Sequence, residues 1–375
     1  MTVQGGWAQR AGGRVDHSGD VVTTPRSDGP SRGPDGPPYL AVRDLSVAFP
    51  TADGEVRAVR DLSFSLALGR TLAIVWESGS GKSVASLSIM GLHDRGSTRM
   101  SGSITLGGHE IVGMSPEELR HHRGVAASMV FQDPLTSLHP YFTVGNQIVE
   151  AYRAHHRVNK RQARERAVDM LARVGIPNPR RRLGDYPHQF SGGMRQRVMI
   201  AMALVNDPKL LIADEPTTAL DVTVQAQILD LIRDLQRDFG SAVLFITHDL
   251  GVVAEIADDL LVMYGGRCME HGGMRTVLGQ PLHPYTWGLL LSVPAVSGET
   301  DRLRPIPGAP PSLLAVPSGC PFHPRCAYRD RVPYDQCREV LPDLYPRTAD
   351  GTRTSRCHLA DPERIFTSDV LPRLS

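Results

Sequence analysis

Four short apolar runs, each followed at once by polar residues, are the feature that most constrains the fold of this chain. The runs are TLAIV (71–75), ASMVF (127–131), LLIA (210–213) and AVLFIT (242–247). Continuous apolar runs of this length are typical of strands that are buried on both faces of a parallel sheet, and such sheets bind ligands at the carboxyl ends of their strands. Any one run could be a core strand followed by an ordinary polar loop. The four together favour a shared site.

The first run leads into a glycine-rich segment, WESGSGKS at 76–83, and an apolar helix is expected after it. The segment matches the pattern G-x-x-x-x-G-K-[ST], in which backbone N–H groups and the positive end of the helix dipole surround phosphates. Lys82 would reach the β- and γ-phosphates, and the Ser83 hydroxyl would bind Mg²⁺. The residues assigned to nucleotide binding here are Glu77, Ser78, Gly79, Ser80, Gly81, Lys82 and Ser83.

Trp76 stands where this pattern begins with glycine. If the turn needs a left-handed backbone, a residue other than glycine costs roughly 1–2 kcal/mol, and the indole must also find room. The hypothesis is that Trp76 weakens nucleotide binding or turnover without destroying the fold. The alternative is a right-handed turn with the indole lying harmlessly over the surface.

Polar side chains after the other runs suit hydrolysis. Asp214 directly follows an apolar run, from which its carboxylate can hold Mg²⁺, and Glu215 could act as the general base for the attacking water. A solvated turn is the alternative for an isolated Asp-Glu pair, but the preceding strand and Pro216 favour catalysis. His248 could contact the γ-phosphate, and Gln132 could sense the metal and the water.

A second helix start follows in FSGGMRQR at 190–197. Ser191 can cap the helix, and Gly192 and Gly193 leave its first N–H groups open for an anion. The structural alternative is a capped core helix that uses small residues for close packing.

These elements, in this order over about 39–300, resemble the ATP-binding subunits of ABC transporters. The resemblance implies an α/β P-loop NTPase cassette, with a parallel-sheet core, an antiparallel β part and a helical subdomain at about 133–195 that receives the coupling helices of membrane permeases. It also implies that the Ser191 helix completes the ATP site of a second ATPase subunit and that Asp221 lies in the loop joining the two halves. Phe49 would stack on adenine, unless it is simply a core residue at the end of the first strand.

Two segments narrow the resemblance, QDPLTSLHP at 132–140 and QPLHPYTWGLLLSVP at 280–294, because both are similar to dipeptide and oligopeptide importers. The resemblance implies MgATP hydrolysis that drives peptide import through two separate permeases, with an extracytoplasmic solute-binding protein delivering the cargo. Importers of nickel or glutathione are an alternative. So is a degenerate scaffold subunit, on account of Trp76. Soluble ABC ATPases of translation or DNA repair usually carry two cassettes or a coiled-coil insertion, which this chain lacks.

Four of the five cysteines are spaced C-x5-C-x10-C-x19-C at Cys320, Cys326, Cys337 and Cys357. Four thiolates can hold zinc or an iron–sulfur cluster. Resemblance to importer ATPases that carry a 4Fe-4S cluster favours the cluster, with zinc or free thiols as alternatives. Cys268 is expected to be a small buried hydrophobe.

Composition sets the remaining bounds. With 41 Lys and Arg against 40 Asp and Glu, no broad basic surface for nucleic acid is expected. The chain has neither a membrane-length apolar run nor a signal-like start, so it is expected to stay in the cytosol. The resemblance to ABC transporters implies that it lies peripherally on the cytoplasmic face of the membrane. Residues 1–38 lack apolar periodicity and are expected to be a disordered tail, followed by an ATPase domain at 39–280 and a cysteine-bearing extension at 281–375.

Overall fold

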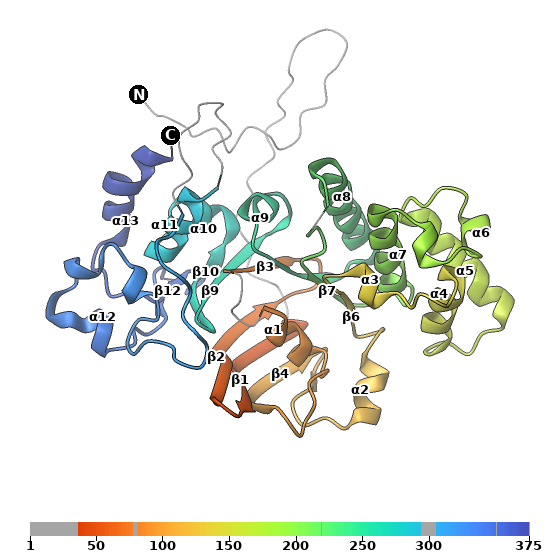
Figure 1. Ribbon diagram of the computed structural model, residues 1–375, viewed down its shortest axis with the longest axis horizontal. Coiled ribbons are helices and arrows are strands. Elements are labelled where there is room, and N and C mark those ends of the chain that lie inside the picture. Colours follow the sequence, from red (N-terminus) through yellow and green to blue (C-terminus); the bar gives the residue numbers. More distant parts are fainter. Residues whose placement is uncertain (1–36, 78–81, 219, 294–304, 350, 375) are drawn as a thin grey trace, which may run out of the picture.

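A mixed sheet runs through the centre of the molecule, between a helical group on one side and the C-terminal region on the other (Figure 1). The computed structural model describes residues 37–77, 82–218, 220–293, 305–349 and 351–374. The predicted tail lies outside these residues except for its last two positions. Ser78, Gly79, Ser80, Gly81 and the side chain of Lys82 lie outside the description as well.

The mixed sheet has the strand order β11-β12-β10-β9-β3-β8-β7-β6. Strands β9, β3, β8, β7 and β6 pair in parallel with their neighbours, whereas the pairs β9–β10, β10–β12 and β12–β11 are antiparallel. The four predicted strands are therefore confirmed, and all four lie side by side. The bounds are β3 Thr71–Trp76, β6 Ala127–Val130, β7 Leu210–Asp214, β8 Ala242–Thr247, β9 Asp259–Tyr264, β10 Arg267–Gly273, β11 Tyr345–Pro346 and β12 Thr354–Ser355.

Alternate residues of the central strands enter two separate hydrophobic cores, which is why their sequences read as unbroken apolar runs. On β7, Leu211 and Ala213 pack into the core that includes helices α7 and α8. Leu210 and Ile212 pack into the opposite core, shared with the antiparallel sheet and helix α1. Both faces of the sheet are thus covered.

The antiparallel sheet has the order β2-β1-β4-β5 and forms the wall of the second core. Its bounds are β1 Leu40–Thr51, β2 Gly54–Leu66, β4 Arg99–Leu106 and β5 His109–Glu110. Helix α1 (Lys82–Ile89) begins at the last two residues of the glycine-rich segment and packs into the same core through Ala85 and Ile89. The predicted helix after the phosphate loop is confirmed.

A cluster of helices connects β6 to β7 and lies together at one end of the molecule (Figure 1). These helices are α3 Pro134–Ser137, α4 Val144–Arg153, α5 Lys160–Arg173, α6 Pro179–Arg182 and α7 Gly192–Leu204, with a 3₁₀ turn at Pro187–Gln189. Asn159 caps α5 in a reciprocal capping box with Gln162, which explains where that helix begins. Helix α2 (Pro116–His122) lies before β6, and α8 (Val222–Phe239) and α9 (Leu250–Ile256) follow β7 and β8.

The C-terminal region is short in regular structure but is tied to the sheet. Its helices are α10 Met274–Gly279, α11 Pro284–Leu291, α12 Gln336–Glu339 and α13 Pro362–Ile365, with 3₁₀ turns at His323–Arg325, Arg329–Arg331, Pro333–Asp335 and Leu371–Arg373 and a π turn at Phe366–Val370. Strand β12 pairs with β10, so that Ser355 lies opposite Glu270. This pairing makes the C-terminal region part of the central sheet.

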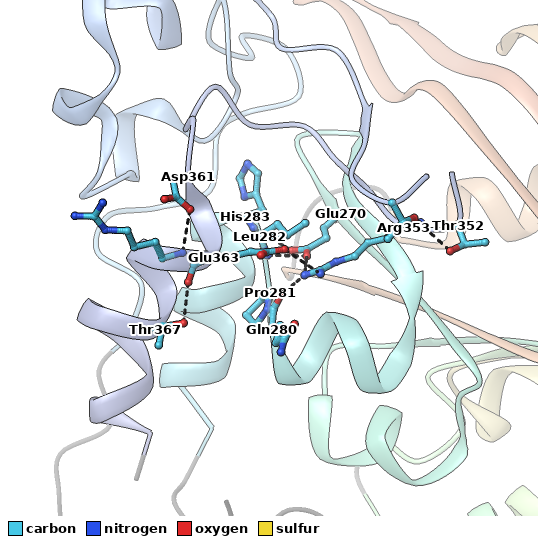
Figure 2. Close-up of polar contacts among 12 residues, drawn as sticks. Glu270, Gln280, Pro281, Leu282, His283, Thr352, Arg353, Asp361, Glu363 and Thr367 are labelled. Atoms are coloured by element: carbon cyan, nitrogen blue, oxygen red, sulfur yellow. Dashed lines mark hydrogen bonds and ion pairs between the residues drawn. The ribbon is translucent and has the colours of Figure 1, made fainter. Parts of the chain in front are cut away.

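Glu270 anchors this junction although it is fully buried (Figure 2). Its carboxylate accepts hydrogen bonds from the backbone N–H of Leu282 at 2.8 Å and of His283 at 3.1 Å, and from the Thr286 hydroxyl at 2.7 Å. The Arg353 guanidinium lies 3.8 Å away and also donates to the Gln280 carbonyl oxygen. Buried polar groups are stable only with such partners, so this network fixes how the C-terminal region meets β10.

Within the residues described, no helix is both long enough and apolar enough to span a bilayer.

Candidate active site at the carboxyl edge of the mixed sheet

Three of the predicted site residues come together where three neighbouring strands end. Gln132 follows β6, Glu215 follows β7 and His248 follows β8, and these strands are adjacent in the sheet. Because parallel strands end at the same edge, residues far apart in sequence meet there.

Glu215 is the centre of this group. Gln132 donates from Nε2 to Glu215 Oε2 at 2.9 Å, and the Thr218 hydroxyl donates to the same oxygen at 2.8 Å. His248 Nδ1 lies 3.5 Å from the other carboxylate oxygen, Oε1. The Glu215 side chain is only 2% exposed, whereas that of His248 is 54% exposed. A buried carboxylate held at both oxygens, beside an imidazole open to solvent, is suited to accept a proton from water.

The backbone of Glu215 is in the left-handed region, with φ +47°. Its N–H still donates to the Ile246 carbonyl oxygen at 2.9 Å, which continues the pairing of β7 with β8 by one residue. A non-glycine residue in this conformation costs on the order of 1–3 kcal/mol, and such strain tends to occur at functional sites. The turn that brings Thr218 back to the carboxylate starts here.

Thr218 is the site residue that the sequence analysis missed. Its backbone N–H donates to the Glu215 carbonyl oxygen at 3.2 Å, closing a four-residue turn from Glu215 to Thr218. The sequence signal was present, since a hydroxyl three residues after a carboxylate in EPTT can fold back onto it.

Asp214 and Ser83 were predicted to hold Mg²⁺. Asp214 is the last residue of β7 and is buried, and Ser83 lies in the first turn of α1. A carboxylate and a hydroxyl suit Mg²⁺, which at phosphate sites takes only one or two protein ligands and completes its shell with phosphate oxygens and water. Gln132 gives its amide N–H to Glu215, which leaves its amide oxygen as the atom that can face a metal or a water.

The structure corrects both expectations for Trp76. The residue is the last of β3, extended and paired with Met263 of β9, so its backbone is not left-handed. Its indole does not lie over the surface either, because it is 1% exposed and packs in the core beneath the antiparallel sheet. Its Nε1 has no hydrogen-bond partner within the described residues. The strand simply continues one residue further than the motif suggests.

Gly192 and Gly193, which follow Ser191 at the start of α7, have different surroundings. Ser191 caps α7, its hydroxyl accepting from the Met194 N–H at 3.4 Å. A Cβ on Gly193 would lie 2.8 Å from a methyl group of Val224 in α8, so close packing requires glycine there. A Cβ on Gly192 would meet no atom within 4 Å. The packing alternative therefore explains Gly193 but not Gly192.

Asp221 and Phe49 both have structural contacts. Asp221 caps α8, its carboxylate accepting from the Val224 N–H at 2.9 Å. Phe49 lies near the end of β1, half buried, with its ring edge against His93 at 5.5 Å between centroids. The His93 ring is in turn held by the Val84 carbonyl oxygen at 2.9 Å, which places Phe49 beside α1.

Comparison with known proteins agrees with this geometry. The family described as "ABC transporter" matches residues 59–218, and "Oligopeptide/dipeptide transporter, C-terminal region" matches residues 269–332. The chain is 55% identical over 289 residues to the oligopeptide transport ATP-binding protein OppD of Escherichia coli (strain K12), covering 77% of this chain and 86% of that protein. The chain belongs to the ABC transporter family.

Other relatives of this ABC protein extend the match. It is 50% identical over 323 residues to the dipeptide transport ATP-binding protein DppD of Bacillus subtilis (strain 168), covering 86% of this chain and 95% of that one. Among solved structures, a dimeric post-hydrolysis state of the ATP-binding cassette MJ0796 bound to ADP and Pi aligns with TM-score 0.57 at 25% identity, covering 63% of this chain and 99% of that chain. The ABC protein is an ATPase with the predicted cassette fold.

The C-terminal cysteines of the ABC ATPase are close enough to influence one another. Burial, together with a smaller effect of the neighbouring thiols, raises the pKa of Cys320 and Cys357 to about 12. Among the described residues, which include all four of these thiols, no three metal-ligating side chains converge tightly enough to hold one metal ion. Cys268 is buried in β10, as predicted.

Proposed function

We propose that this ATPase energises the import of dipeptides and oligopeptides through separate membrane permeases. The observation that carries the catalytic part is the Glu215 carboxylate, held by Gln132, Thr218 and His248 at the ends of adjacent strands. The match of the C-terminal region to oligopeptide and dipeptide transporters, and relatives named for transport of those solutes, support the cargo.

In the proposed reaction, Glu215 accepts the proton of the water that attacks the γ-phosphate. Gln132 and Thr218 fix the carboxylate, so that no reorganisation is needed when the proton moves. The exposed imidazole of His248 contacts the γ-phosphate. Mg²⁺, when bound, neutralises phosphate charge, and Ser83 and Asp214 would hold it. The segment from Glu77 to Ser83 would surround the phosphates, and Phe49 would stack on the adenine.

The proposed working unit is a dimer of ATPase subunits, identical or homologous. Gly192, with open space where a side chain would be, suits the approach of a nucleotide carried by a second subunit. Asp221 lies near this helix start through its contact with Val224, which packs on Gly193. The solved dimer of a related cassette supports this arrangement.

The proposed docking surface for the permeases follows Gln132 directly. Leu135 of α3 is 62% exposed, and Tyr141 and Phe142 are 83% and 53% exposed. Three large apolar side chains left open within eight residues suit a protein interface better than solvent. The helices from α3 to α7 would form the helical subdomain at 133–195, within an ATPase domain at 39–280, placing the protein peripherally on the cytoplasmic face of the membrane. A solute-binding protein would deliver the peptide from outside.

The four C-terminal cysteines are proposed as ligands of a 4Fe-4S cluster in the extension at 281–375. Mutual influence among the thiols of Cys320, Cys326, Cys337 and Cys357 supports a common site. A four-iron cluster is larger than one ion, so its thiolates need not converge as the ligands of zinc must. Iron and acid-labile sulfide measured on anaerobically purified protein test this. Neither present in the wild type, with all four cysteines reduced, would reject it.

Uptake into vesicles tests the transport function. The vesicles contain the ATPase with its two permeases, oriented so that the ATPase faces the lumen, and the solute-binding protein is added outside. They should accumulate a labelled tetrapeptide only when ATP is enclosed in the lumen. Nickel and glutathione serve as competing cargoes. Uptake of either of these without peptide uptake would reject the peptide assignment but leave the ATPase intact.

A further inference from the structure

Arg325 of the C-terminal region makes a bidentate ion pair with Glu77, near the start of the glycine-rich segment. One terminal nitrogen, Nη1, lies 2.5 Å from Glu77 Oε2, and the other, Nη2, lies 3.0 Å from Oε1. The two residues are 248 positions apart. The Arg325 side chain is 5% exposed and that of Glu77 27% exposed, so solvent screens this pair far less than a surface pair.

The guanidinium is fixed on every side. Besides the two bonds to Glu77, Nη1 donates to the Tyr264 hydroxyl at 3.2 Å. Nε donates to the Pro307 carbonyl oxygen at 2.8 Å, and Nη2 to the Ile306 carbonyl oxygen at 3.2 Å. An arginine has five N–H donors, and these five bonds use that full number. Arg325 therefore has one geometry, which it imposes on the carboxylate it holds.

The backbone that presents Arg325 is also rigid. A 3₁₀ turn at His323–Arg325 carries it, and Phe322 packs its ring against Tyr264 and Tyr285 at 5.2 Å and 5.3 Å between centroids. Tyr264 is the last residue of β9, which pairs with β3. The C-terminal turn thus packs against the end of β9, the strand that pairs with β3, and the phosphate-binding segment follows β3.

Glu77 occupies the position that makes this contact consequential. It directly follows Trp76, where β3 ends, and is the second residue of WESGSGKS. Fixing its side chain fixes the direction in which the chain leaves the strand toward Lys82, the first residue of α1. Phosphate-binding loops act through the placement of their backbone N–H groups, so the exit from the strand governs how well they fit the phosphates.

We propose that Arg325 is a positioning residue for ATP: by holding Glu77 from the C-terminal region, it sets the affinity of the phosphate-binding segment for the nucleotide. The inference rests on the ATPase activity but not on the cargo. It gives the C-terminal region a part in nucleotide binding, beyond completing the edge of the sheet. Lysine is not expected to replace Arg325, because an ammonium group lacks the planar fork that matches a carboxylate and has only three N–H donors for these five bonds.

The variants E77Q, R325Q and the double variant E77Q/R325Q test this on the full chain. We expect each single variant to raise the Kd for MgATP about 5–30-fold, and the KM for ATP of the assembled complex by the same factor, with kcat within about twofold of wild type. Loss of ground-state and transition-state binding together changes KM and not kcat. Since each substitution removes the same ion pair, the double variant should bind MgATP no more weakly than the worse of the two single variants.

Further variants separate positioning from folding. R325K should behave like R325Q, although it keeps the charge. R331Q is the matched control, because it breaks an exposed ion pair with Asp369 in the same region and should leave Kd and KM unchanged. Both constants stay unchanged as long as nearly all of the protein is folded, so a variant that is only less stable keeps its KM below its unfolding transition. A wild-type KM in R325Q, or factors that multiply in the double variant, would overturn the proposal. Should R325Q not fold, a wild-type KM in E77Q would overturn it equally.

Discussion

Gln132 hydrogen-bonds Glu215 across 83 positions of sequence, joining the end of β6 to the end of β7 at 2.9 Å. The exposed apolar residues Leu135, Tyr141 and Phe142 begin three positions after Gln132. If a permease displaces that surface, the movement can therefore reach Gln132, which holds the general base, through only a few residues of chain. This bond connects the strand that leads into the proposed docking surface with the proposed general base.

Removing either hydrogen bond to Glu215 should lower turnover. We expect Q132A and T218V each to reduce kcat about tenfold with KM for ATP nearly unchanged, because a net hydrogen bond to a charged group is worth about 1.5–3 kcal/mol and part of it is replaced by water. Steady-state phosphate release by the assembled complex measures this. T217V is the control, since Thr217 is the neighbouring hydroxyl and is not one of the side chains that contact the carboxylate in the described part of the chain, which are Gln132, Thr218 and His248. Full activity of both Q132A and T218V would contradict the assigned roles.

Trp76 should now be tested first as a core residue. Replacing its buried indole by glycine should lower the free energy of unfolding by roughly 3–5 kcal/mol, the usual cost of deleting a large buried side chain. Trp76→Phe should lose much less, because it keeps most of the volume. Urea unfolding measures both.

The hypothesis that Trp76 slows turnover stays a prediction. It calls for a comparison of ATPase rates at a temperature where Trp76→Gly is folded. Equal rates for the two proteins would remove it.

The two glycines at the start of α7 should respond differently to alanine. Gly193→Ala should destabilise the protein, because its methyl group would press on Val224, and V224A in the same chain should relieve this. Gly192→Ala has room and should raise stability by up to about 1 kcal/mol, the gain of alanine over glycine in a helix. If a second subunit's nucleotide approaches here, Gly192→Ala should still impair ATP hydrolysis by the dimer. A stable Gly192→Ala protein with full activity would argue against that approach.

The buried pair Glu270 and His283 should make stability depend on pH in opposite senses. Burial raises the pKa of Glu270 from 4.5 to about 7, so the folded state binds its proton more tightly and the stabilisation is lost as pH rises through about 7. Burial lowers the pKa of His283 from 6.5 to about 3, so its contribution is lost as pH falls below 6.5. Between pH 4.5 and pH 6.5, a change of pH therefore alters the free energy of unfolding in opposite directions through the two residues.

Removing the Glu270 carboxylate should reveal how His283 alone makes the free energy of unfolding depend on pH. In Glu270→Gln, stability should fall more steeply on acidification than in wild type, by on the order of 2–3 kcal/mol between about pH 7 and about pH 5. Denaturant unfolding across this range measures it. Glu363→Gln is the control, since Glu363 faces the same Arg353 but is largely exposed. Parallel pH curves for wild type and Glu270→Gln would contradict the shifted pKa.

The sequence predicted best where burial on both faces leaves a continuous pattern. β3, β6, β7 and β8 were found within one residue of their true ends because alternate residues of each enter two apolar cores. The position of Glu215 followed from the same logic, since strand ends of a parallel sheet coincide. The grouping of Gln132 and His248 around it depends on the strand order, which the pairing of β6 with β7 and of β7 with β8 shows.

Contacts without a local pattern could not be predicted. Whether β3 continued through Trp76 depended on its pairing with Met263, which is remote in sequence. The bond between Glu77 and Arg325 joins two segments that carry no shared periodicity. The four-cysteine spacing indicated a common site but not how tightly the thiols converge, which depends on turns such as the one that bonds the Cys320 N–H to the Cys337 carbonyl oxygen.

The central claim is that Glu215 is the general base of ATP hydrolysis, and Glu215→Gln tests it most directly. The account predicts that the assembled complex with Glu215→Gln binds MgATP about as tightly as wild type but releases phosphate about 10²–10⁴-fold more slowly. Glu255→Gln, an exposed carboxylate on α9, should match wild type in both. Phosphate release by Glu215→Gln at the wild-type rate would contradict the account.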